Sequence, residues 1–194
     1  MKRRIVVALT GASGSVYGVR LLEELNKTEG VETHLIVSNA AWLNLSAELD
    51  IGRQQVESLA DVAYSDKDIG ASIASGSFRT DAMVVAPCSM RTLAGIATGL
   101  AGSLITRAAD VTLKERRRLL LLTREAPLNL VHLRNMVTVT EMGGIVFPPV
   151  PAFYLGLDSL DAMVDQTVGR MLELLGIASP LLKRWEGMRS RPPD

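Results

Sequence analysis

The stretch Thr10-Gly11-Ala12-Ser13-Gly14-Ser15-Val16-Tyr17 decides how this chain is interpreted. The apolar run at residues 5–9 before it is typical of a buried parallel strand, and residues 18–25 after it have apolar side chains at helical spacing. In such a strand–turn–helix unit, the first N–H groups of the helix and the helix dipole together favour an anion. The glycines allow a close backbone approach, although their spacing is neither a dinucleotide fingerprint nor a P-loop. The turn indicates an anion site or, alternatively, a structural turn that binds nothing.

Apolar runs and helical segments alternate along the rest of the chain. Further strands are predicted at residues 31–37, 81–87, 119–122 and 145–147, with a brief extended piece at 61–65. Further helices are predicted at residues 38–49, 52–59, 94–99, 103–116, 129–142 and 160–175, and a loop with a short helix at 66–80. This alternation predicts an α/β protein with an open, mostly parallel sheet and helices on both faces.

Composition and charge exclude several classes of protein. Lys+Arg and Asp+Glu both number 21, so the formal net charge is zero, whereas a nucleic-acid binder usually has a basic excess. Cys88 is the single cysteine, which leaves no internal disulfide, and we interpret it as a small buried thiol because no base is placed beside it. His34 and His132 lie far apart without carboxylates at ligand spacing, so we expect no metal site.

The length of 194 residues suits one domain with a sizeable core, which we place at residues 1–186, followed by a flexible tail at residues 187–194. No apolar run reaches the roughly 18 residues of a membrane helix, and the pattern of a signal peptide is missing, so we expect a cytoplasmic protein. Only 4% of the residues are aromatic, and this neutral, Ala- and Leu-rich composition is compatible with burial against copies of the same chain.

Ligands of such sheets bind beyond the carboxyl ends of the strands, where the strand order reverses. The turns at residues 10–14, 38–39, 87–92 and 123–127 fall on this edge. They bring together Ser13, Ser38, Ser89, Thr92, Arg124 and Glu125. An edge rich in hydroxyl groups with one Arg suits a phosphate and a flat heteroaromatic ring, such as those of flavin mononucleotide (FMN).

Two further features concern charged side chains on helices. Glu48 lies near the end of a predicted helix, where a carboxylate is unfavourable against the helix dipole. Arg107, Asp110 and Lys114 share one helix face, which by itself is typical of a solvated face with salt bridges.

Seven motifs, read in order over residues 2–186, resemble those of one family. They are Gly11-Ala12-Ser13-Gly14, Ser75-Gly76-Ser77-Phe78, Pro87-Cys88-Ser89-Met90, Arg107-Ala108-Ala109-Asp110-Val111, Leu113-Lys114-Glu115-Arg116-Arg117, Arg124-Glu125-Ala126-Pro127 and Pro149-Val150-Pro151-Ala152-Phe153-Tyr154. The family is that of the flavin prenyltransferases of the UbiX/Pad type, formerly described as aromatic acid decarboxylases. The chain departs from it at Leu155-Gly156-Leu157, where members often have His-x-Pro, and at Arg118, where Pro is usual.

The resemblance implies a flavodoxin-like (Rossmann-like) single domain that binds reduced FMN as the prenyl acceptor and needs no metal. A dimethylallyl group would pass from dimethylallyl monophosphate first to N5 and then to C6 of the flavin. The product, prenylated FMN, would serve a UbiD-class decarboxylase. Members of the family are usually dodecamers, which implies a homo-oligomer here.

The resemblance also assigns roles to residues of this chain. FMN would be held by Gly11, Ala12, Ser13, Ser38, Ser89, Met90, Arg91, Thr92 and Arg124, with its phosphate at the first turn. The phosphate of the substrate would be held by Lys114, Arg124, Tyr154 and Arg170, and Arg107 would reach the same pocket, from a neighbouring subunit if not from its own. Ser13, Glu48, Lys114 and Glu125 would be catalytic, the two carboxylates moving protons. Trp185 would cover the substrate or, alternatively, only dock the C-terminal segment.

Two other functions remain open from the sequence. A flavin-dependent decarboxylase of the phosphopantothenoylcysteine type shares the fold, but it uses a catalytic His and a Pro-x-Met-Asn motif where this chain has Arg124-Glu125-Ala126-Pro127. A non-catalytic subunit that stores or delivers FMN would not need a second phosphate pocket, so Lys114 and Arg170 argue against it.

Overall fold

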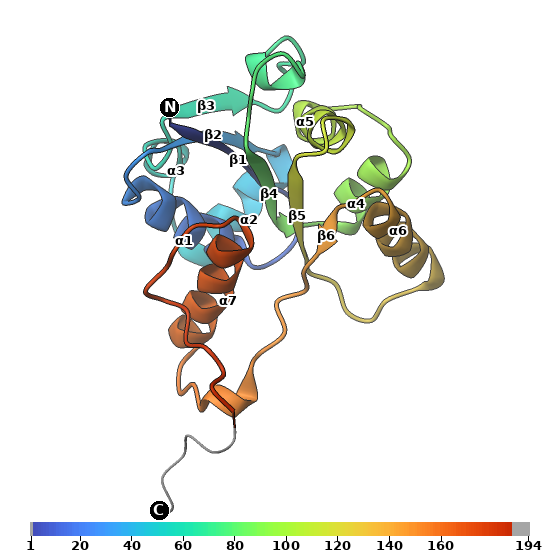
Figure 1. Ribbon diagram of the computed structural model, residues 1–194. Coiled ribbons are helices and arrows are strands. Elements are labelled where there is room, and N and C mark those ends of the chain that lie inside the picture. Colours follow the sequence, from blue (N-terminus) through green and yellow to red (C-terminus); the bar gives the residue numbers. More distant parts are fainter. Residues whose placement is uncertain (1, 188–194) are drawn as a thin grey trace, which may run out of the picture. The chain divides into compact units, whose positions relative to one another are not determined.

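The structure, a computed structural model, describes residues 2–187 (Figure 1). The chain divides into two compact units, Met1–Pro149 and Val150–Asp194. Apart from Gly187, the predicted tail lies outside the described residues. The single domain at residues 1–186 stays a prediction.

The first unit is built on a sheet whose described strands are all parallel, in the order β3-β2-β1-β4-β5-β6. The strands are β1 (Arg3–Leu9), β2 (Val31–Val37), β3 (Val62–Ser65), β4 (Ala82–Cys88), β5 (Arg118–Thr123) and β6 (Ile145–Val146). If the short edge strand β3 is set aside, the remaining five follow the flavodoxin order 2-1-3-4-5. The predicted α/β fold with a parallel sheet is confirmed.

The helices of this unit connect successive strands (Figure 1). They are α1 (Ser15–Asn26), α2 (Asn39–Leu49), α3 (Arg53–Glu57), α4 (Met90–Ala97), α5 (Leu104–Lys114) and α6 (Leu130–Glu141), with a 3-10 turn η1 (Ser72–Ala74). Two begin earlier than predicted: α1 starts directly after the left-handed Gly14, and α4 starts directly after its cap Ser89. Within the described residues, no helix is both long enough and apolar enough to cross a membrane.

The strand residues alternate between two apolar faces, as a sheet covered on both sides requires. One face of β1, β2, β4 and β5 forms a core with apolar side chains from α4, α5 and α6; it contains Val6, Ile36, Val85, Leu121 and Leu104. The opposite face packs against α1, where Gly18 lies so close that a Cβ would stand 2.3 Å from the carbonyl oxygen of Ala86. The strand ends therefore have rigid support on both sides.

A buried polar cluster joins β2 to β3 and to the loop after η1. The His34 ring, which is 2% exposed, contacts the hydroxyl of Tyr64 through Nδ1 at 3.0 Å and Glu32 through Nε2 at 2.9 Å. Its edge meets the ring of Phe78 at a centroid distance of 5.4 Å, and Arg4 pairs with Glu32 at 3.0 Å. Both ring nitrogens of this histidine thus have partners within the protein.

The second unit contains a 3-10 turn η2 (Phe153–Leu155) and the helix α7 (Leu160–Leu174). Ser159 caps α7 by accepting a hydrogen bond from Ala162 N–H at 3.2 Å. The segment after the helix returns along it, because Gln166 bonds both the N–H and the carbonyl oxygen of Lys183 at 2.9 Å. Gly169 allows this approach, since a Cβ there would lie 2.8 Å from the backbone nitrogen of Leu182.

Candidate active site

The strand order reverses between β1 and β4, which are neighbours in the sheet. After β1 the chain moves to β2 on one side, and after β4 it moves to β5 on the other. The two strands keep a regular register as far as Ala8 and Val85, and Thr10 N–H then donates to the carbonyl oxygen of Pro87 at 3.2 Å. A crevice opens at such a point beyond the carboxyl ends of the strands, which is where ligands of doubly wound sheets bind.

An open pocket of about 1170 Å³ lies at this edge of the first unit. The sequence-predicted residues in its lining are Gly11, Ser38, Ser89, Met90, Arg91, Thr92 and Glu125. The structure thus brings together residues from all four turns that the sequence places at this edge. Its volume lies slightly above the usual range of about 300–1,000 Å³ for small-molecule sites.

The donors around the pocket fit FMN. Ser38 caps α2 by accepting from Ala41 N–H at 3.2 Å, and Ser89 caps α4 by accepting from Thr92 N–H at 3.3 Å. Each helix start carries N–H groups without intrahelical partners, which favour a phosphate. The serine hydroxyl groups can bond the hydroxyl-bearing chain that joins the flavin ring to its phosphate. A Cβ on Gly11 would stand 2.5 Å from the Cβ of Ala40, so this turn lies directly against the start of α2.

Glu48 occupies the start of α1, which differs from the expectation that the first turn holds the FMN phosphate. Its carboxylate accepts hydrogen bonds from Ser15 N–H at 2.9 Å and from Gly14 N–H at 3.0 Å. Burial acts to raise the pKa of Glu48, but hydrogen bonds from Ser15, Ser13 and Gly14 outweigh it and hold the pKa below its ordinary value of 4.5. An internal anion therefore already engages these two backbone donors.

Arg124 and Glu125 follow β5 and are both exposed. Arg124 N–H donates to the carbonyl oxygen of Cys88 at 3.4 Å, which attaches this turn to the end of β4. Burial raises the pKa of Tyr17 on α1, and the positive charge of Arg124 offsets part of that rise, so the two side chains are electrostatic neighbours. Glu125 lines the pocket and accepts a hydrogen bond from Ala126 N–H at 3.2 Å.

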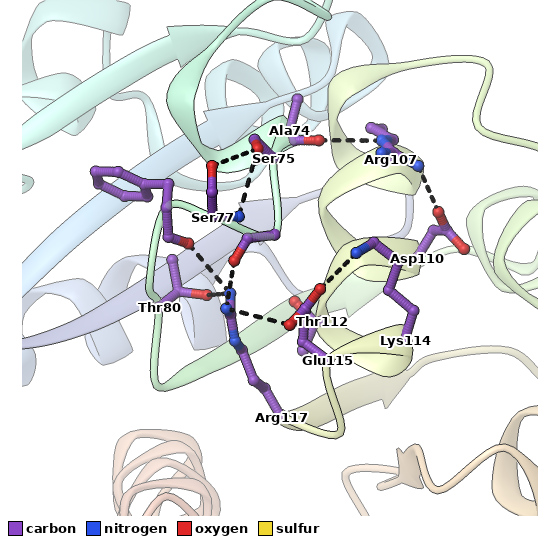
Figure 2. Close-up of polar contacts among 12 residues, drawn as sticks. Ala74, Ser75, Ser77, Thr80, Arg107, Asp110, Thr112, Lys114, Glu115 and Arg117 are labelled. Atoms are coloured by element: carbon purple, nitrogen blue, oxygen red, sulfur yellow. Dashed lines mark hydrogen bonds and ion pairs between the residues drawn. The ribbon is translucent and has the colours of Figure 1, made fainter.

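Arg107 and Lys114 are not among the residues that line this pocket, and Figure 2 shows their polar contacts. Arg107 donates to the carbonyl oxygen of Ala74 at 3.1 Å and pairs with Asp110 at 2.7 Å. Lys114 pairs with Glu115 at the end of α5, shortly before β5 begins, and hence at the amino edge of the sheet. Within one chain, neither side chain lines the pocket with Gly11, so the structure does not bring the whole predicted set together.

The Lys114–Glu115 pair lies against the loop that follows η1, and Figure 2 shows this pair with Arg117. The Arg117 guanidinium donates to the carbonyl oxygens of Gly76 at 2.7 Å and Phe78 at 3.2 Å, and it lies 3.8 Å from Glu115. A Cβ on Gly76 would stand 2.2 Å from Oε1 of Glu115 and 2.7 Å from Nζ of Lys114. The loop after η1 therefore packs directly on the Lys114–Glu115 pair.

The predicted residues of the second unit are exposed. The rings of Tyr154 and Trp185 meet edge to face at a centroid distance of 5.0 Å. Arg170 pairs with Glu173, which also pairs with Arg184. Tyr154 and Trp185 thus support each other on the surface of this unit.

Sequence reasoning missed two residues at the carboxyl edge. Thr10 links the ends of β1 and β4, and the charge of Arg124 acts on the hydroxyl of Tyr17. Both stand in the stretch that predicts the first turn, but their contacts depend on which strands are neighbours in the sheet. For Tyr17 there is one indication in the sequence: it follows Gly14 by about one helical turn, so its ring can lie close to Gly14.

Neither metal chemistry nor thiol chemistry is indicated by the side chains. Among residues 2–187, no three His, Cys, Asp or Glu side chains are grouped so as to hold a metal ion. Cys88 is fully buried, and burial raises the pKa of its thiol to about 12. The thiol therefore stays protonated at neutral pH, in agreement with its interpretation as a small buried side chain.

Comparisons with known proteins agree with this geometry. A family model described as Flavoprotein matches residues 1–181. A probable UbiX-like flavin prenyltransferase of Bacillus subtilis is 54% identical over 98% of this chain and 93% of its own length. The flavin prenyltransferase UbiX of Neisseria meningitidis is 53% identical over 97% of this chain and 99% of its own length.

Two solved structures have nearly the same fold. AnUbiX in complex with FMN and dimethylallyl pyrophosphate has a TM-score of 0.94 at 49% identity, covering 96% of this chain and 99% of its own. A dodecameric FMN-dependent UbiX-like decarboxylase of Escherichia coli has a TM-score of 0.93 at 45% identity, covering 95% of this chain and 100% of its own. A PPC decarboxylase, at 21% identity and a TM-score of 0.62, shares the fold alone. By its pocket, its fold and its near full-length relatives, this chain belongs to the flavin prenyltransferase family of flavoproteins.

Proposed function

We propose that this protein transfers a dimethylallyl group from dimethylallyl monophosphate to reduced FMN. The observation that carries the proposal is the pocket at the point where the strand order reverses, which joins the Gly11, Ser38 and Ser89 turns to the acid Glu125. The pocket thus combines donors suited to a phosphorylated flavin with a group that can exchange a proton at its rim. Membership of the flavin prenyltransferase family supports this activity.

FMN is assigned to the turns that surround the pocket. The proposed contacts are Gly11, Ala12, Ser13, Ser38, Ser89, Met90, Arg91, Thr92 and Arg124. Because Glu48 already engages the start of α1, the starts of α2 and α4 are better placed to hold the FMN phosphate. When bound in its reduced form, FMN supplies the nucleophilic atoms N5 and C6.

Two carboxylates are assigned to proton movement. Hydrogen bonds from Ser15, Ser13 and Gly14 hold the pKa of Glu48 below its ordinary value, so its carboxylate is ionised at neutral pH. The same bonds make it a weak base, so we assign it to take a proton only from a strongly acidic group, with the Ser13 hydroxyl beside it. Glu125 lines the pocket and is exposed, so it can exchange protons with solvent as well as with a ligand. We propose that Glu48 and Glu125 stand at the two ends of the path along which the proton moves.

The phosphate of dimethylallyl monophosphate needs positive charge, since it leaves as an anion. Positioned cations in a water-poor site are typically worth a few kcal/mol each to such a step. Arg124, Tyr154 and Arg170 are proposed to hold this phosphate, with Trp185 covering the prenyl chain. Since Arg107 and Lys114 do not line the pocket of their own chain, we propose that a second copy supplies them.

This sharing of residues requires a homo-oligomer. The dodecameric relative of Escherichia coli supports a similar assembly for this chain. We propose a UbiD-class decarboxylase as the recipient of the product, as the resemblance to the flavin prenyltransferases implies.

Subunit complementation tests the shared site. Lys114→Gln and Glu125→Gln variants are purified alone and after co-expression, and prenyl transfer to FMN is measured. Each variant alone is expected to be nearly inactive, while mixed oligomers should regain a clear fraction of wild-type activity, because some sites receive both native residues. Mixed oligomers as inactive as either parent would overturn the assignment of Lys114 to a neighbouring pocket.

A further inference from the structure

Thr10 connects the two strands at the centre of the sheet, just beyond Ala8 and Val85, where their regular register ends. It directly follows β1 and is 1% exposed. Its hydroxyl donates to the carbonyl oxygen of Pro87 at 2.8 Å and accepts from Ser89 N–H at 2.8 Å. Its own N–H also donates to Pro87, at 3.2 Å. One buried side chain thus serves as donor and acceptor across the crevice.

The hydrogen bonds of Thr10 lie just beyond the last residue pair of the regular register between β1 and β4. The register between β1 and β4 ends at Ala8 and Val85, and the pairing of β4 with β5 is irregular between Val85 and Cys88. Beyond the Ala8–Val85 pair, Thr10 holds the two strands together, through its N–H bond to Pro87 at 3.2 Å and through its hydroxyl. The Thr10 hydroxyl adds two side-chain hydrogen bonds to this backbone bond.

Thr10 connects the Gly11 turn to the Ser89 turn, and Gly11 and Ser89 both line the proposed flavin pocket. On one side, Ala12 N–H donates to the Thr10 carbonyl oxygen at 2.8 Å, which closes the turn that contains Gly11. On the other side, Ser89 receives its orientation from two bonds: its N–H binds Thr10, and its hydroxyl accepts from Thr92 N–H at 3.3 Å. Gly11 and Ser89 are therefore walls of one pocket tied to one residue.

We propose that Thr10 is a positioning residue of the flavin site, which sets the distance between the Gly11 turn and the Ser89 turn before FMN arrives. The inference rests on the proposed function, since it takes the pocket to be the FMN site. A site already held in its binding geometry loses less conformational entropy when the ligand binds. Without the hydroxyl, the partly buried Ser89 N–H loses its partner, and the turn is free to shift.

The test compares three variants with the wild-type protein by their dissociation constants for FMN, measured by fluorescence quenching. Thr10→Val keeps the shape and removes the hydroxyl, and it should raise the dissociation constant at least about tenfold. Thr10→Ser keeps the hydroxyl and should stay within about threefold of wild type. Thr112→Val is the control, since Thr112 is also 1% exposed and donates to Ala108 at 2.7 Å on α5, outside the pocket lining.

The control separates positioning from stability. Thr112→Val should leave the FMN dissociation constant and the visible spectrum of bound flavin unchanged, and the melting temperature of every variant is measured beside them so that a loss of stability is seen separately. If Thr10→Val does not fold, Thr10→Ala replaces it, with the same expected loss of FMN affinity. A wild-type protein that does not bind FMN overturns the proposed function. A wild-type protein that binds FMN, with a hydroxyl-free variant of equal affinity, overturns the role of Thr10 alone.

Discussion

The carboxylate of Glu48 accepts a 2.9 Å hydrogen bond from the backbone N–H of Ser15, 33 residues earlier in the chain. Glu48 lies in the last turn of α2, where its charge opposes the dipole of its own helix. The same charge is favourable at the start of α1, where it meets unpaired N–H groups. One ion thus joins the two helices and shapes the turn that follows β1.

Glu48→Gln should destabilise the fold by about 1 kcal/mol at pH 7, the usual size of a lost N-terminal cap. Because the pKa of Glu48 is lowered on folding, its contribution is fully present above the ordinary pKa of 4.5 and is lost as the pH falls through the lower folded value. Urea unfolding at pH 7 and pH 4 measures this. Glu29→Gln, at an exposed carboxylate after α1, is the control. Equal losses in both variants would contradict the cap.

Glu125→Gln should leave FMN bound and slow prenyl transfer by roughly 10²-fold or more, the usual contribution of a positioned acid or base. The amide keeps the shape of the side chain at the pocket but cannot exchange the proton. FMN affinity and single-turnover rates are measured side by side. Glu141→Gln, at an exposed residue of α6, controls for loss of charge. Wild-type turnover in Glu125→Gln would remove Glu125 from the mechanism.

Much of the fold could be predicted because each strand of a two-sided parallel sheet is a short apolar run. Val31–Val37 is β2 as predicted, and the turns at the strand ends meet as the rule for parallel sheets requires. The sequence also marks Glu48 as misplaced against its own helix, yet it cannot name Ser15 as the partner. That contact depends on how α1 and α2 pack, which local spacing does not contain.

The helix face of Arg107, Asp110 and Lys114 is a second case in which local spacing predicts one contact but not another. Arg107 and Asp110 form the ion pair that helical spacing predicts. Lys114 instead pairs with its neighbour Glu115, because α5 ends there and Glu115 leaves the helix. Whether such a face lines the pocket of its own chain is a property of the sheet topology and could not be predicted from the spacing.

Gly76→Ala should weaken substrate binding with little effect on stability. The added methyl meets the flexible ends of Glu115 and Lys114, which can move away at low cost but then change their positions. We expect the KM for dimethylallyl monophosphate to rise several-fold, with the FMN dissociation constant and the melting temperature nearly unchanged.

Gly70→Ala is the matched control for this loop. A Cβ at Gly70 would meet only an oxygen of Asp68 at an ordinary distance of 3.6 Å. An equal rise in KM for the two variants would show that the Lys114–Glu115 pair is not the cause.

His34 should make stability depend on pH. Burial lowers the pKa of His34 below its ordinary value of 6.5, with Glu32, Arg4, Asp61 and Tyr64 around the ring. The unfolded chain then takes up the proton first, so stability is full above about pH 6.5 and falls as the pH drops below it. Urea unfolding at pH 7.5 and 5.5 measures the slope, which His34→Gln should reduce. An unchanged slope in that variant would assign the pH dependence to other groups.

The mass of the flavin released after anaerobic reaction tests the central claim most directly. The purified protein is incubated with FMN, a reductant and dimethylallyl monophosphate, and the flavin is then analysed by mass spectrometry. The proposed activity predicts a flavin heavier by one five-carbon prenyl unit, formed only when protein and substrate are both present. FMN that binds the protein and returns with unchanged mass would contradict the activity and indicate a protein that stores or delivers the flavin.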